Sequence, residues 1–582
     1  MAKKTVRGTK PYTGTAKADK ITVIGKKNKV SGAGGNDTIT VKRGSKHTIY
    51  GAAGNDKIYI KGSSKSSHIY GDDAKGKVSG KDTITISGGK KNTIYSGKGA
   101  DTIIVNKGSS TIYGGKGNDV FVIGKNSTGK AIVKDFKSSD KVKVAGGAVK
   151  NIKASGSDRI ITGGKSGSLT LKGAKPNKFI VTDTNGEYTV SSSAVDLVLK
   201  KSFTGHFTAQ SFLRNIDARW VTANGAGVTG NAKANTINVA NVDGGYYYGG
   251  GGNDTIIVNQ RNNHTIYGDD SGGQLAGDDK ITITGGSTGN TIYGGKGKEN
   301  ITVKSGTHMI YGGEGGDIIN VTSGVSGQSV HGDEDNDDIT VSGGNIHSIF
   351  GDDGDDKISV TGGVNHHIEG GAGKDTITVT NVTFDSNSSY RNTNTPYISA
   401  GYAGTKTVTL SGCKNAIVYG SEDGNTINIL NSQNTEVSCA HGNDKVNITG
   451  GNNTNVYSKK GLNTISVSGK NVTINQWRNP SYHDDGAKDN ITVNWSANIG
   501  RLSIITSYPD SGGVDALRIN NAVVSNLKFY KVDTWNLLIE GYNGNSIFID
   551  GWFSTKAFAN GVNVGGTNYT YSWISDRAML KS

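Results

Sequence analysis

The sequence has few prolines, few cysteines and no long apolar run, and each shortage excludes a class of protein. Proline occurs 5 times and glycine 88 times in 582 residues, which favours tight turns between short strands over a disordered proline-rich linker. Two cysteines, Cys413 and Cys439, are too few for a disulfide framework, and we expect free thiols. No run approaches the roughly 18 apolar residues of a membrane helix, so we expect no membrane insertion.

The N-terminal stretch and the low apolar content exclude further classes of protein. Residues 1–8 carry basic side chains but no apolar core follows them, so the start is not a typical secretory signal peptide. Only 33% of the residues are hydrophobic, which is little for a deep globular core. A stack of coils needs less, because each coil buries only a thin inward stripe against its neighbours.

Charge is distributed unevenly along the chain. Residues 1–150 carry 30 Lys and Arg against 10 Asp and Glu, whereas residues 229–380 carry 8 against 20. The basic part could suit nucleic acid, but its lysines alternate with Ser, Thr and Gly and lack interleaved aromatic residues. We therefore interpret it as a soluble lysine-rich face and expect no nucleic-acid partner. Opposite charge on the two parts would permit attraction between copies of the chain.

A tandem repeat dominates the sequence. The pattern GxxGxD followed by Thr or Lys and then Ile returns every 18 to 20 residues, as at Gly51–Ile58 and Gly370–Ile377. A fixed period of this length indicates one structural unit stacked many times. The aspartate position falls at Asp19, Asp37, Asp56, Asp82, Asp101 and Asp119, and again at Asp254, Asp279, Glu299, Asp317, Asp337, Asp356 and Asp375.

Each repeat contains two short apolar–polar alternations, such as Ile39–Val41 and Ile49–Tyr50, bounded by glycine-rich turns. Such alternation is typical of strands. We predict an all-β protein made of two right-handed parallel β-roll (β-solenoid) arrays, each followed by a β-rich capping module. Only one turn of each coil carries the aspartate motif, so the roll should have one metal edge and one metal-free edge.

The repeat and its interruptions divide the sequence into four segments. We predict a first, basic β-roll over 1–145, a β capping module over 146–228, a second, acidic β-roll over 229–475 and a C-terminal β cap over 476–582. The second array degenerates after about residue 382, beyond the polar insertion 385–394, where Lys406, Asn425 and Asn463 replace aspartates. All six tryptophans lie in or at the edge of the two non-repetitive segments, whose sequences also resemble one another.

The recurring turn has the chemistry of a calcium site. Calcium prefers six to eight oxygen ligands in a forgiving geometry, glycines let main-chain carbonyls point inward, and stacked coils bring ligand sets about 4.8 Å apart. Nitrogen and sulfur ligands are lacking there, which disfavours zinc and copper. An Asx-capped turn in an ion-free solenoid is the alternative. The predicted Ca2+ ligands are Asp37, Asp56, Asp101, Asp119, Asp254, Asp279, Asp317, Asp337, Asp356, Asp375 and Asp444.

Other polar residues near the repeat are not predicted as ligands. We expect weak or no binding where the aspartate is replaced, at Glu299, Asn235, Asn425 and Asn463. In the insertions, we expect solvated loop residues at Asp72, Asp73, Asp269 and Asp270. We expect the histidines at the metal-free turns, such as His47, His366 and His367, to be surface residues.

The segments Gly312–Ile319, Gly370–Ile377 and Gly114–Phe121 resemble the RTX family (repeats-in-toxin, haemolysin-type calcium-binding repeats), whose nonapeptide is GGxGxDxUx, with U a large apolar residue. Residues 131–142 are similar to the tail that often closes such arrays. The family repeat usually recurs about every nine residues, half the interval found here. The resemblance implies a calcium-folded β-roll and type I export to the outside of a bacterial cell, with a type I secretion region in the C-terminal segment 476–582.

We expect a structural protein and not an enzyme, because repeat-like coils begin near Asp19 and no GxSxG, HExxH or P-loop is present. The leading hypothesis is a secreted calcium-binding surface protein, such as an adhesin, matrix component or S-layer-like subunit, that associates with itself. A polysaccharide-binding or polysaccharide-modifying protein that contacts cell-surface glycan is the alternative, and a toxin accessory or toxin fragment is a third.

Overall fold

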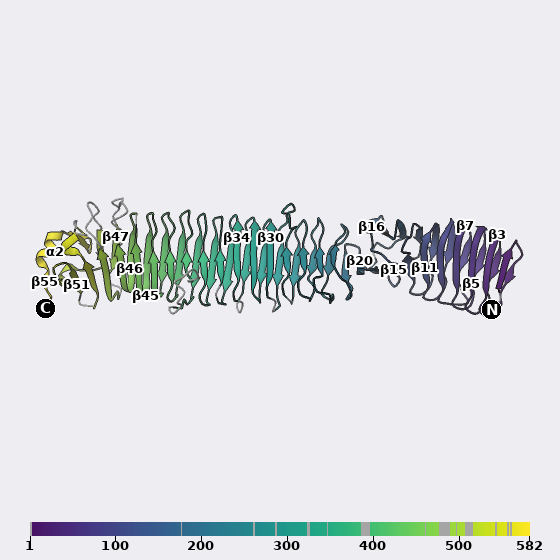
Figure 1. The fold of residues 1–582 in the computed structure, drawn as a ribbon, viewed down its shortest axis with the longest axis horizontal. Helices are drawn as coiled ribbons and strands as arrows, with labels where there is room; N and C mark the ends of the chain where they lie inside the picture. The colour runs from purple at the N-terminus through teal and green to yellow at the C-terminus, as the bar shows by residue number, and fades with distance from the viewer. Residues whose placement is uncertain are drawn as a thin grey trace. The chain divides into compact units, whose positions relative to one another are not determined.

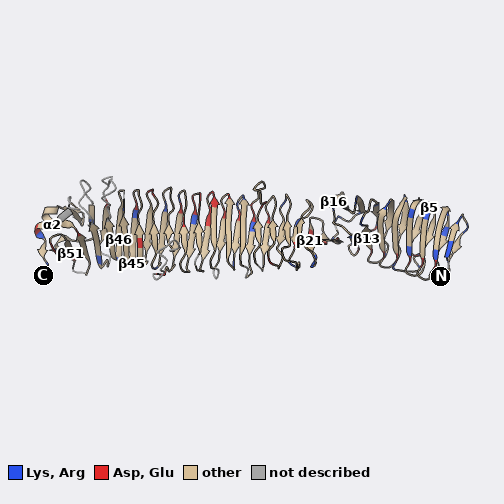
Figure 2. Ribbon diagram, in the orientation of Figure 1, with Lys and Arg blue, Asp and Glu red and all other residues tan. Residues whose placement is uncertain are grey.

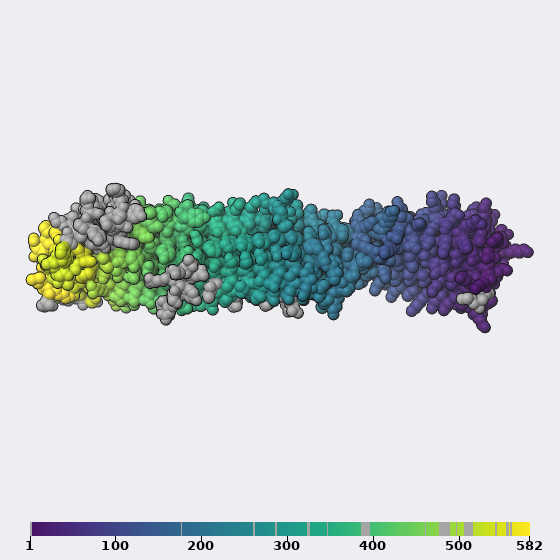
Figure 3. Space-filling model, viewed as in Figure 1, coloured from purple at the N-terminus to yellow at the C-terminus, as the bar shows by residue number. Residues whose placement is uncertain are grey.

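A computed structural model describes most of the chain. It covers residues 3–581 except 176, 260–261, 286–287, 323–325, 346, 386–395, 460, 477–488, 496–497, 507–515, 542–543, 556–557 and 559–560. The chain forms two compact units, Met1–Tyr246 and Tyr247–Ser582. Figure 1 shows strands stacked in sequence order within each unit, and Figure 3 shows that the surface colour changes steadily along each of them.

In the first unit, successive coils contribute one strand to each of two parallel ladders. The first ladder consists of β1 (Lys3–Arg7), β3 (Lys20–Lys26), β5 (Thr38–Ser45), β7 (Lys57–Lys65), β9 (Thr83–Lys90), β11 (Thr102–Lys107), β13 (Val120–Ile123), β15 (Lys141–Val144) and β19 (Phe179–Thr182). The second consists of β2 (Tyr12–Thr13), β4 (Lys29–Ser31), β6 (Thr48–Tyr50), β8 (His68–Tyr70), β10 (Asn92–Tyr95), β12 (Ser109–Tyr113), β14 (Lys130–Val133) and β18 (Gly167–Leu171).

The remaining strands of this unit break the regular stack and then restore it. Antiparallel pairs join β16 (Asn151–Ser155), β17 (Asp158–Gly163) and β18, and also β19, β20 (Gly186–Val190) and β21 (Val195–Leu199). Parallel pairing resumes from β21 to β23 (Asn215–Asp217) and β25 (Thr236–Asn238), and from β22 (His206–Thr208) to β24 (Gly227–Thr229). Parallel coils therefore extend into the segment predicted as the first cap.

The second unit repeats the two-ladder arrangement. One ladder contains β27 (Thr255–Val258), β29 (Lys280–Ile283), β31 (Asn300–Val303), β33 (Ile318–Val321), β35 (Asp338–Ser342), β37 (Lys357–Thr361), β39 (Thr376–Thr380), β41 (Thr407–Ser411) and β43 (Thr426–Leu430). The other contains β26 (Tyr246–Tyr248), β28 (Thr265–Tyr267), β30 (Asn290–Lys296), β32 (His308–Glu314), β34 (Ser329–Glu334), β36 (Ser348–Phe350), β38 (His367–Glu369), β40 (Ile398–Ser399), β42 (Ile417–Tyr419) and β44 (Gln433–Ser438).

Toward the C-terminus the strands lengthen and the pattern changes. The long strands β45 (Lys445–Ser458) and β46 (Thr464–Gln476) bend through the turn and belong to both ladders. Parallel pairing continues to β47 (Asn490–Asn494), β48 (Arg501–Thr506), β49 (Ala516–Asn520), β52 (Ser546–Asp550) and β53 (Val562–Val564). The end adds β50 (Leu527–Lys531), β51 (Leu537–Gly541), β54 (Thr567–Tyr569), β55 (Met579–Leu580), a 3-10 turn η1 (Val524–Asn526), and two helices, α1 (Trp552–Thr555) and α2 (Tyr571–Arg577).

The core of each unit is a set of aliphatic columns. Ile21, Ile39 and Ile58 are in register on successive strands and are fully buried, and the intervening Thr22 and Thr40 face outward. Each buried aliphatic side chain contributes about 1.5–3 kcal/mol from the hydrophobic effect. The prediction of an all-β parallel β-solenoid is thus confirmed. The predicted free thiols are confirmed as well, because Cys413 and Cys439 are buried and unbonded to each other.

Aromatic rings form a second kind of column on the coil surface. Tyr50, Tyr70, Tyr95 and Tyr113 stack with ring centroids 4.9 Å apart, which is the spacing of adjacent strands. In the second unit the column begins Tyr248, Tyr267, Tyr293, Tyr311 and continues with His331 and Phe350. These rings lie just before the glycine-rich turns and keep the turns of successive coils in register.

Candidate metal edge

The GxxGxD turn directs its aspartate into the coil. Asp56 is 1% exposed, and a Cβ atom added to Gly51 would lie only 2.4 Å from its Oδ2 and 2.2 Å from the Gly71 carbonyl oxygen of the next coil. The second and fourth positions, Ala52 and Gly54, have φ values of +80° and +126°, which favour glycine. The first glycine therefore makes room for the carboxylate, and the others bend the chain around it.

One oxygen of each aspartate forms a ladder between coils. The Asp37 amide donates to Asp56 Oδ1 at 2.6 Å, and the Asp356 amide donates to Asp375 Oδ1 at 3.0 Å. The same bond joins Asp19 to Asp37, Asp56 to Asp82, Asp82 to Asp101, Asp101 to Asp119, Asp119 to Asp140, Asp254 to Asp279, Glu299 to Asp317, Asp317 to Asp337, Asp337 to Asp356 and Asn425 to Asp444. We call this series the carboxylate column, one in each unit.

All eleven predicted ligands lie in these two columns, at successive levels and buried. Their Oδ2 atoms differ from the bonded Oδ1 atoms. Within the described residues, a buried Oδ2 without a hydrogen-bond partner occurs at Asp37, Asp56, Asp82, Asp101, Asp119, Asp279, Asp337, Asp356 and Asp444. A buried polar oxygen that lacks a partner is costly, so each of these atoms is suited to a cation or a proton.

Burial moves these carboxyl groups toward neutrality in the absence of a cation. Desolvation, together with the charges of neighbouring aspartates, raises the pKa of Asp56 to about 7 and that of Asp82 to about 8, against the lowering effect of the ladder bonds. In the second unit the pKa of Asp337 rises to about 8 and that of Asp356 to about 7 for the same reasons. Near neutral pH the members with the highest pKa values, such as Asp82 and Asp337, therefore hold protons unless cations replace them.

Lys406 shows where a positive charge sits in this edge. It stands at the aspartate position of its coil, because its neighbour Thr407 pairs with Thr376. Its Nζ donates to Asp375 Oδ2 at 2.7 Å, to the Gly371 carbonyl at 2.9 Å and to the Gly373 carbonyl at 2.6 Å. Both charged side chains are fully buried. The ammonium thus occupies an all-oxygen cage made of a carboxylate and the carbonyls of motif positions two and four.

Other non-aspartate members of the columns are accommodated differently. Asn425 Nδ2 donates to Asp444 Oδ1 at 2.9 Å and to two carbonyls of its own turn. The side-chain NH2 group thus satisfies oxygen atoms that a cation would otherwise coordinate. Burial and hydrogen bonding to Asp317 raise the pKa of Glu299 to about 10, which keeps that side chain neutral. These positions were expected to bind ions weakly or not at all, and that expectation stays a prediction.

Two groups that the sequence placed on the surface are buried. Asp72 and Asp269, interpreted as solvated loop residues, are each 1% exposed and accept hydrogen bonds from the Lys98 and Lys296 amides. The expectation was wrong because Asp72 and Asp269 still belong to the coil, and each inserted loop begins only after them. The interval between successive aspartate positions, usually about 19 residues, is longer at both places, and this longer interval was the signal in the sequence.

The opposite turn also carries a ladder, made of neutral groups. The His308 amide donates to Gln328 Oε1 at 3.0 Å, and the Gln328 amide donates to His347 Nδ1 at 3.2 Å. Burial lowers the pKa of His308 and of His366, so both rings remain neutral. His366 Nδ1 accepts from the His347 amide, whereas His308 Nε2 donates to the Ser305 carbonyl. The sequence-based expectation that His47 and His366 lie on the surface was wrong, since both are fully buried.

Comparison with known proteins assigns the chain to no family. No protein-family model matches the chain, and no curated protein sequence matches it. Among the described residues, no helix has the length and apolarity needed to cross a membrane.

The donor set of the carboxylate columns fits calcium. It consists of carboxylate and main-chain carbonyl oxygens without nitrogen or sulfur, which suits a hard cation. The partnerless Oδ2 atoms and the lysine ammonium that stands in for an ion both indicate places for positive charge.

Proposed function

We propose that this chain is a secreted calcium-binding structural protein of the cell surface or extracellular matrix, with a coil that folds on calcium. The observation that carries the proposal is Lys406, whose ammonium is held by Asp375 Oδ2 and two motif carbonyls. Calcium at the other levels would serve as Lys406 does at this one, by neutralising buried carboxylates.

Coupling between metal and folding follows from the raised pKa values. Without a cation, ionisation of Asp82 or Asp337 opposes burial, whereas a bound cation stabilises the ionised form. Extracellular modules bind calcium at concentrations on the order of 1 mM. A chain with these sites would stay unfolded during export from a calcium-poor cytoplasm and fold outside, in line with its resemblance to RTX repeats.

A role in assembly is part of the proposal. Lys and Arg residues are conspicuous on the N-terminal strands of the first unit (Figure 2). The acidic character of residues 229–380 complements that basic part. Association of copies through these faces would suit an adhesin, a matrix component or an S-layer-like subunit.

Circular dichroism and small-angle scattering test the calcium step. We expect chelator to lower the melting temperature, so that at a temperature where the calcium-bound chain is folded the strand signal falls and the chain expands, and about 1 mM calcium to restore both. Magnesium at equal ionic strength is the control, because it demands a stricter octahedral geometry. A chain that stays compact and strand-rich in chelator, and that binds no calcium in equilibrium dialysis, would remove the proposal.

A further inference from the structure

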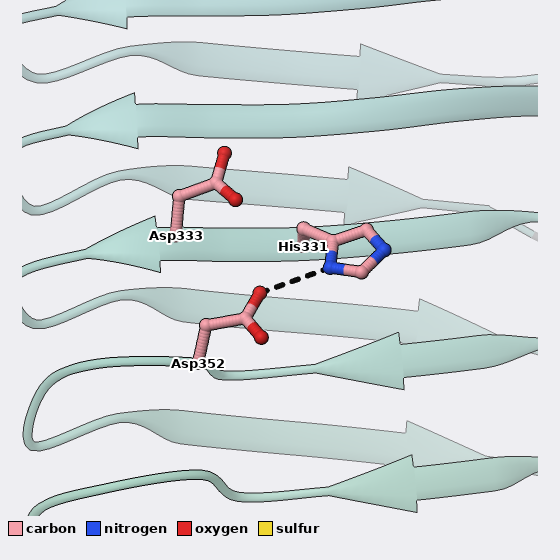
Figure 4. A group of neighbouring side chains, drawn as sticks. All are labelled: His331, Asp333 and Asp352. Atoms are coloured by element: carbon pink, nitrogen blue, oxygen red, sulfur yellow. Dashed lines mark hydrogen bonds and ion pairs between the residues drawn. The ribbon is translucent and has the colours of Figure 1, made fainter.

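Three side chains with metal-ligating atoms converge outside the carboxylate column of the second unit. His331 and Asp333 lie on β34, and Asp352 follows β36 in the next coil. Figure 4 shows the three side chains on the same side of the two neighbouring strands, with the imidazole turned toward Asp352. His331 Nδ1 lies 3.0 Å from Asp352 Oδ2, and one ligand atom from each residue falls within 4.8 Å of the others.

All three positions depart from the repeat. His331 is in register with Tyr311 of the preceding coil, and Asp333 is in register with Gly313. Asp333 and Asp352 have φ values of +74° and +70°, in the left-handed region that favours glycine. The chain therefore carries a histidine and two strained aspartates at one place where its own pattern has tyrosine and glycine.

The histidine is oriented for coordination. Its Nε2 lies 3.2 Å from Ser329 Oγ, on the side away from the carboxylates. Without a bound metal, Nδ1–H donates to Asp352 Oδ2. A bound metal would replace that proton, and the remaining ring proton would then lie on Nε2 and be donated to Ser329 Oγ. Metal-bound histidines usually donate their second ring N–H to such a partner, which fixes the tautomer.

The surroundings attract cations and leave room for water. The cluster borders an open groove of about 560 Å³ whose lining includes Asp269, Asp270, Glu314, Glu334 and Asp353. Lys296 also lines it, but its Nζ already pairs with Glu314 at 2.7 Å. An excess of negative charge raises the local concentration of cations, and the groove leaves further coordination positions open to solvent.

We propose that His331, Asp333 and Asp352 bind a divalent transition metal of the zinc class, separately from the calcium sites. One imidazole nitrogen and two carboxylate oxygens are ligands that zinc accepts at about 2.0–2.2 Å. The nitrogen donor distinguishes this cluster from the all-oxygen columns, which suit calcium. Small side-chain rotations bring the three ligand atoms to one ion, because all three come from the surface of neighbouring strands.

Titration of the full chain with zinc and with cobalt, in excess calcium, tests the assignment. We expect one zinc site of micromolar or tighter affinity, and a cobalt visible spectrum typical of mixed nitrogen and oxygen ligands. The double variant His331→Tyr/Asp333→Gly restores the pattern of the preceding coil and so retains the fold. It should lose at least tenfold in zinc affinity and lose the cobalt spectrum.

Matched control variants distinguish zinc binding by the three residues from nonspecific attraction of zinc to the acidic groove. Glu334→Gln lines the same groove, and His441→Gln removes an exposed histidine that contacts Glu422. Both should bind zinc like the parent chain. Ser329→Ala should weaken zinc binding by about 10–100-fold, as expected for a group that orients a ligand. Equal zinc binding by the parent and the double variant, or no binding by the parent at 100-fold the expected concentration, overturns the proposal without bearing on calcium.

Discussion

At the residue scale, the first glycine of each motif and the aspartate five positions later act as a pair. Gly51 lacks the Cβ atom that would occupy the space of Asp56 Oδ2. The aspartate needs that space because its other oxygen, Oδ1, accepts a hydrogen bond from the Asp37 amide of the preceding coil. A glycine that looks like a simple turn former is therefore a packing requirement of the carboxylate column.

Gly51→Ala tests this pairing. We expect destabilisation by about 2 kcal/mol or more, because the new methyl group overlaps the Gly71 carbonyl and Asp56 Oδ2. Gly147→Ala is the matched control, since a Cβ there meets nothing within 4 Å and its φ is not positive. Denaturant unfolding in calcium compares the two. Equal midpoints would contradict the packing role.

Lys406→Met tests the ammonium at the same scale. Loss of one partner of a buried ion pair costs about 3–5 kcal/mol, so the variant should be less stable than the parent in chelator. Added calcium should recover much of the loss, because Asp375 Oδ2 and the two carbonyls then accept the ion. Lys414→Met, at an exposed lysine of the same segment, should change little. Thermal unfolding with and without calcium measures both, and a loss that calcium cannot recover would count against the cage as a cation site.

At the element scale, the carboxylate column behaves as one titrating unit. Its members have pKa values raised from 3.8 to about 6–8, as at Asp37, Asp56 and Asp82. The folded, metal-free state therefore binds more protons than the unfolded state between about pH 4 and 8. Stability contributed by these groups is fully present below pH 4 and is lost as pH rises through 6–8.

We accordingly expect the melting temperature in chelator to fall between pH 5 and pH 8, by on the order of 10 °C. Calcium should abolish this fall, because a bound cation favours the ionised carboxylates. Differential scanning calorimetry across this range, with and without calcium, is the measurement. A metal-free melting temperature that rises toward pH 8 would show that the column is not the dominant titrating element.

Asp356→Asn examines one level of the column. The amide oxygen can keep the ladder bond from the Asp337 amide, and the structure already accommodates Asn463 in the same role, where its Oδ1 accepts from the Asp444 amide. The variant removes a buried charge, so it should be as stable as the parent or more stable in chelator at pH 8. It should also bind one calcium fewer in equilibrium dialysis. An unchanged stoichiometry would exclude Asp356 as a ligand.

At the scale of the whole molecule, the opposite charges of residues 1–150 and 229–380 make association testable. Light scattering in calcium should show assemblies at low ionic strength that dissociate as salt rises above about 0.2 M, where screening is strong. Assembly indifferent to salt would remove the electrostatic part of the proposal.

The repeat was sufficient to predict the solenoid, because alternations such as Ile39–Val41 recur at a fixed interval and specify the same inward stripe in each coil. The aspartate positions were also predictable, since one residue type recurs at one point of the coil. Their inward direction was not, because it depends on contacts such as Gly51 with the Gly71 carbonyl across coils. The grouping of His331 with Asp352 likewise depends on exact register between coils.

The direction of the ladder bonds gives the solenoid a polarity. Each coil offers an amide that only the following coil can satisfy, as when Asp119 donates to Asp140 and Asn463 donates to Asp489. The exposed C-terminal face of a partly folded stack therefore presents this aspartate amide to the next coil, together with the strand groups that pair between coils. A truncation along the stack would leave the aspartate amide at the cut without its carboxylate acceptor, in addition to the unpaired groups of the last two strands.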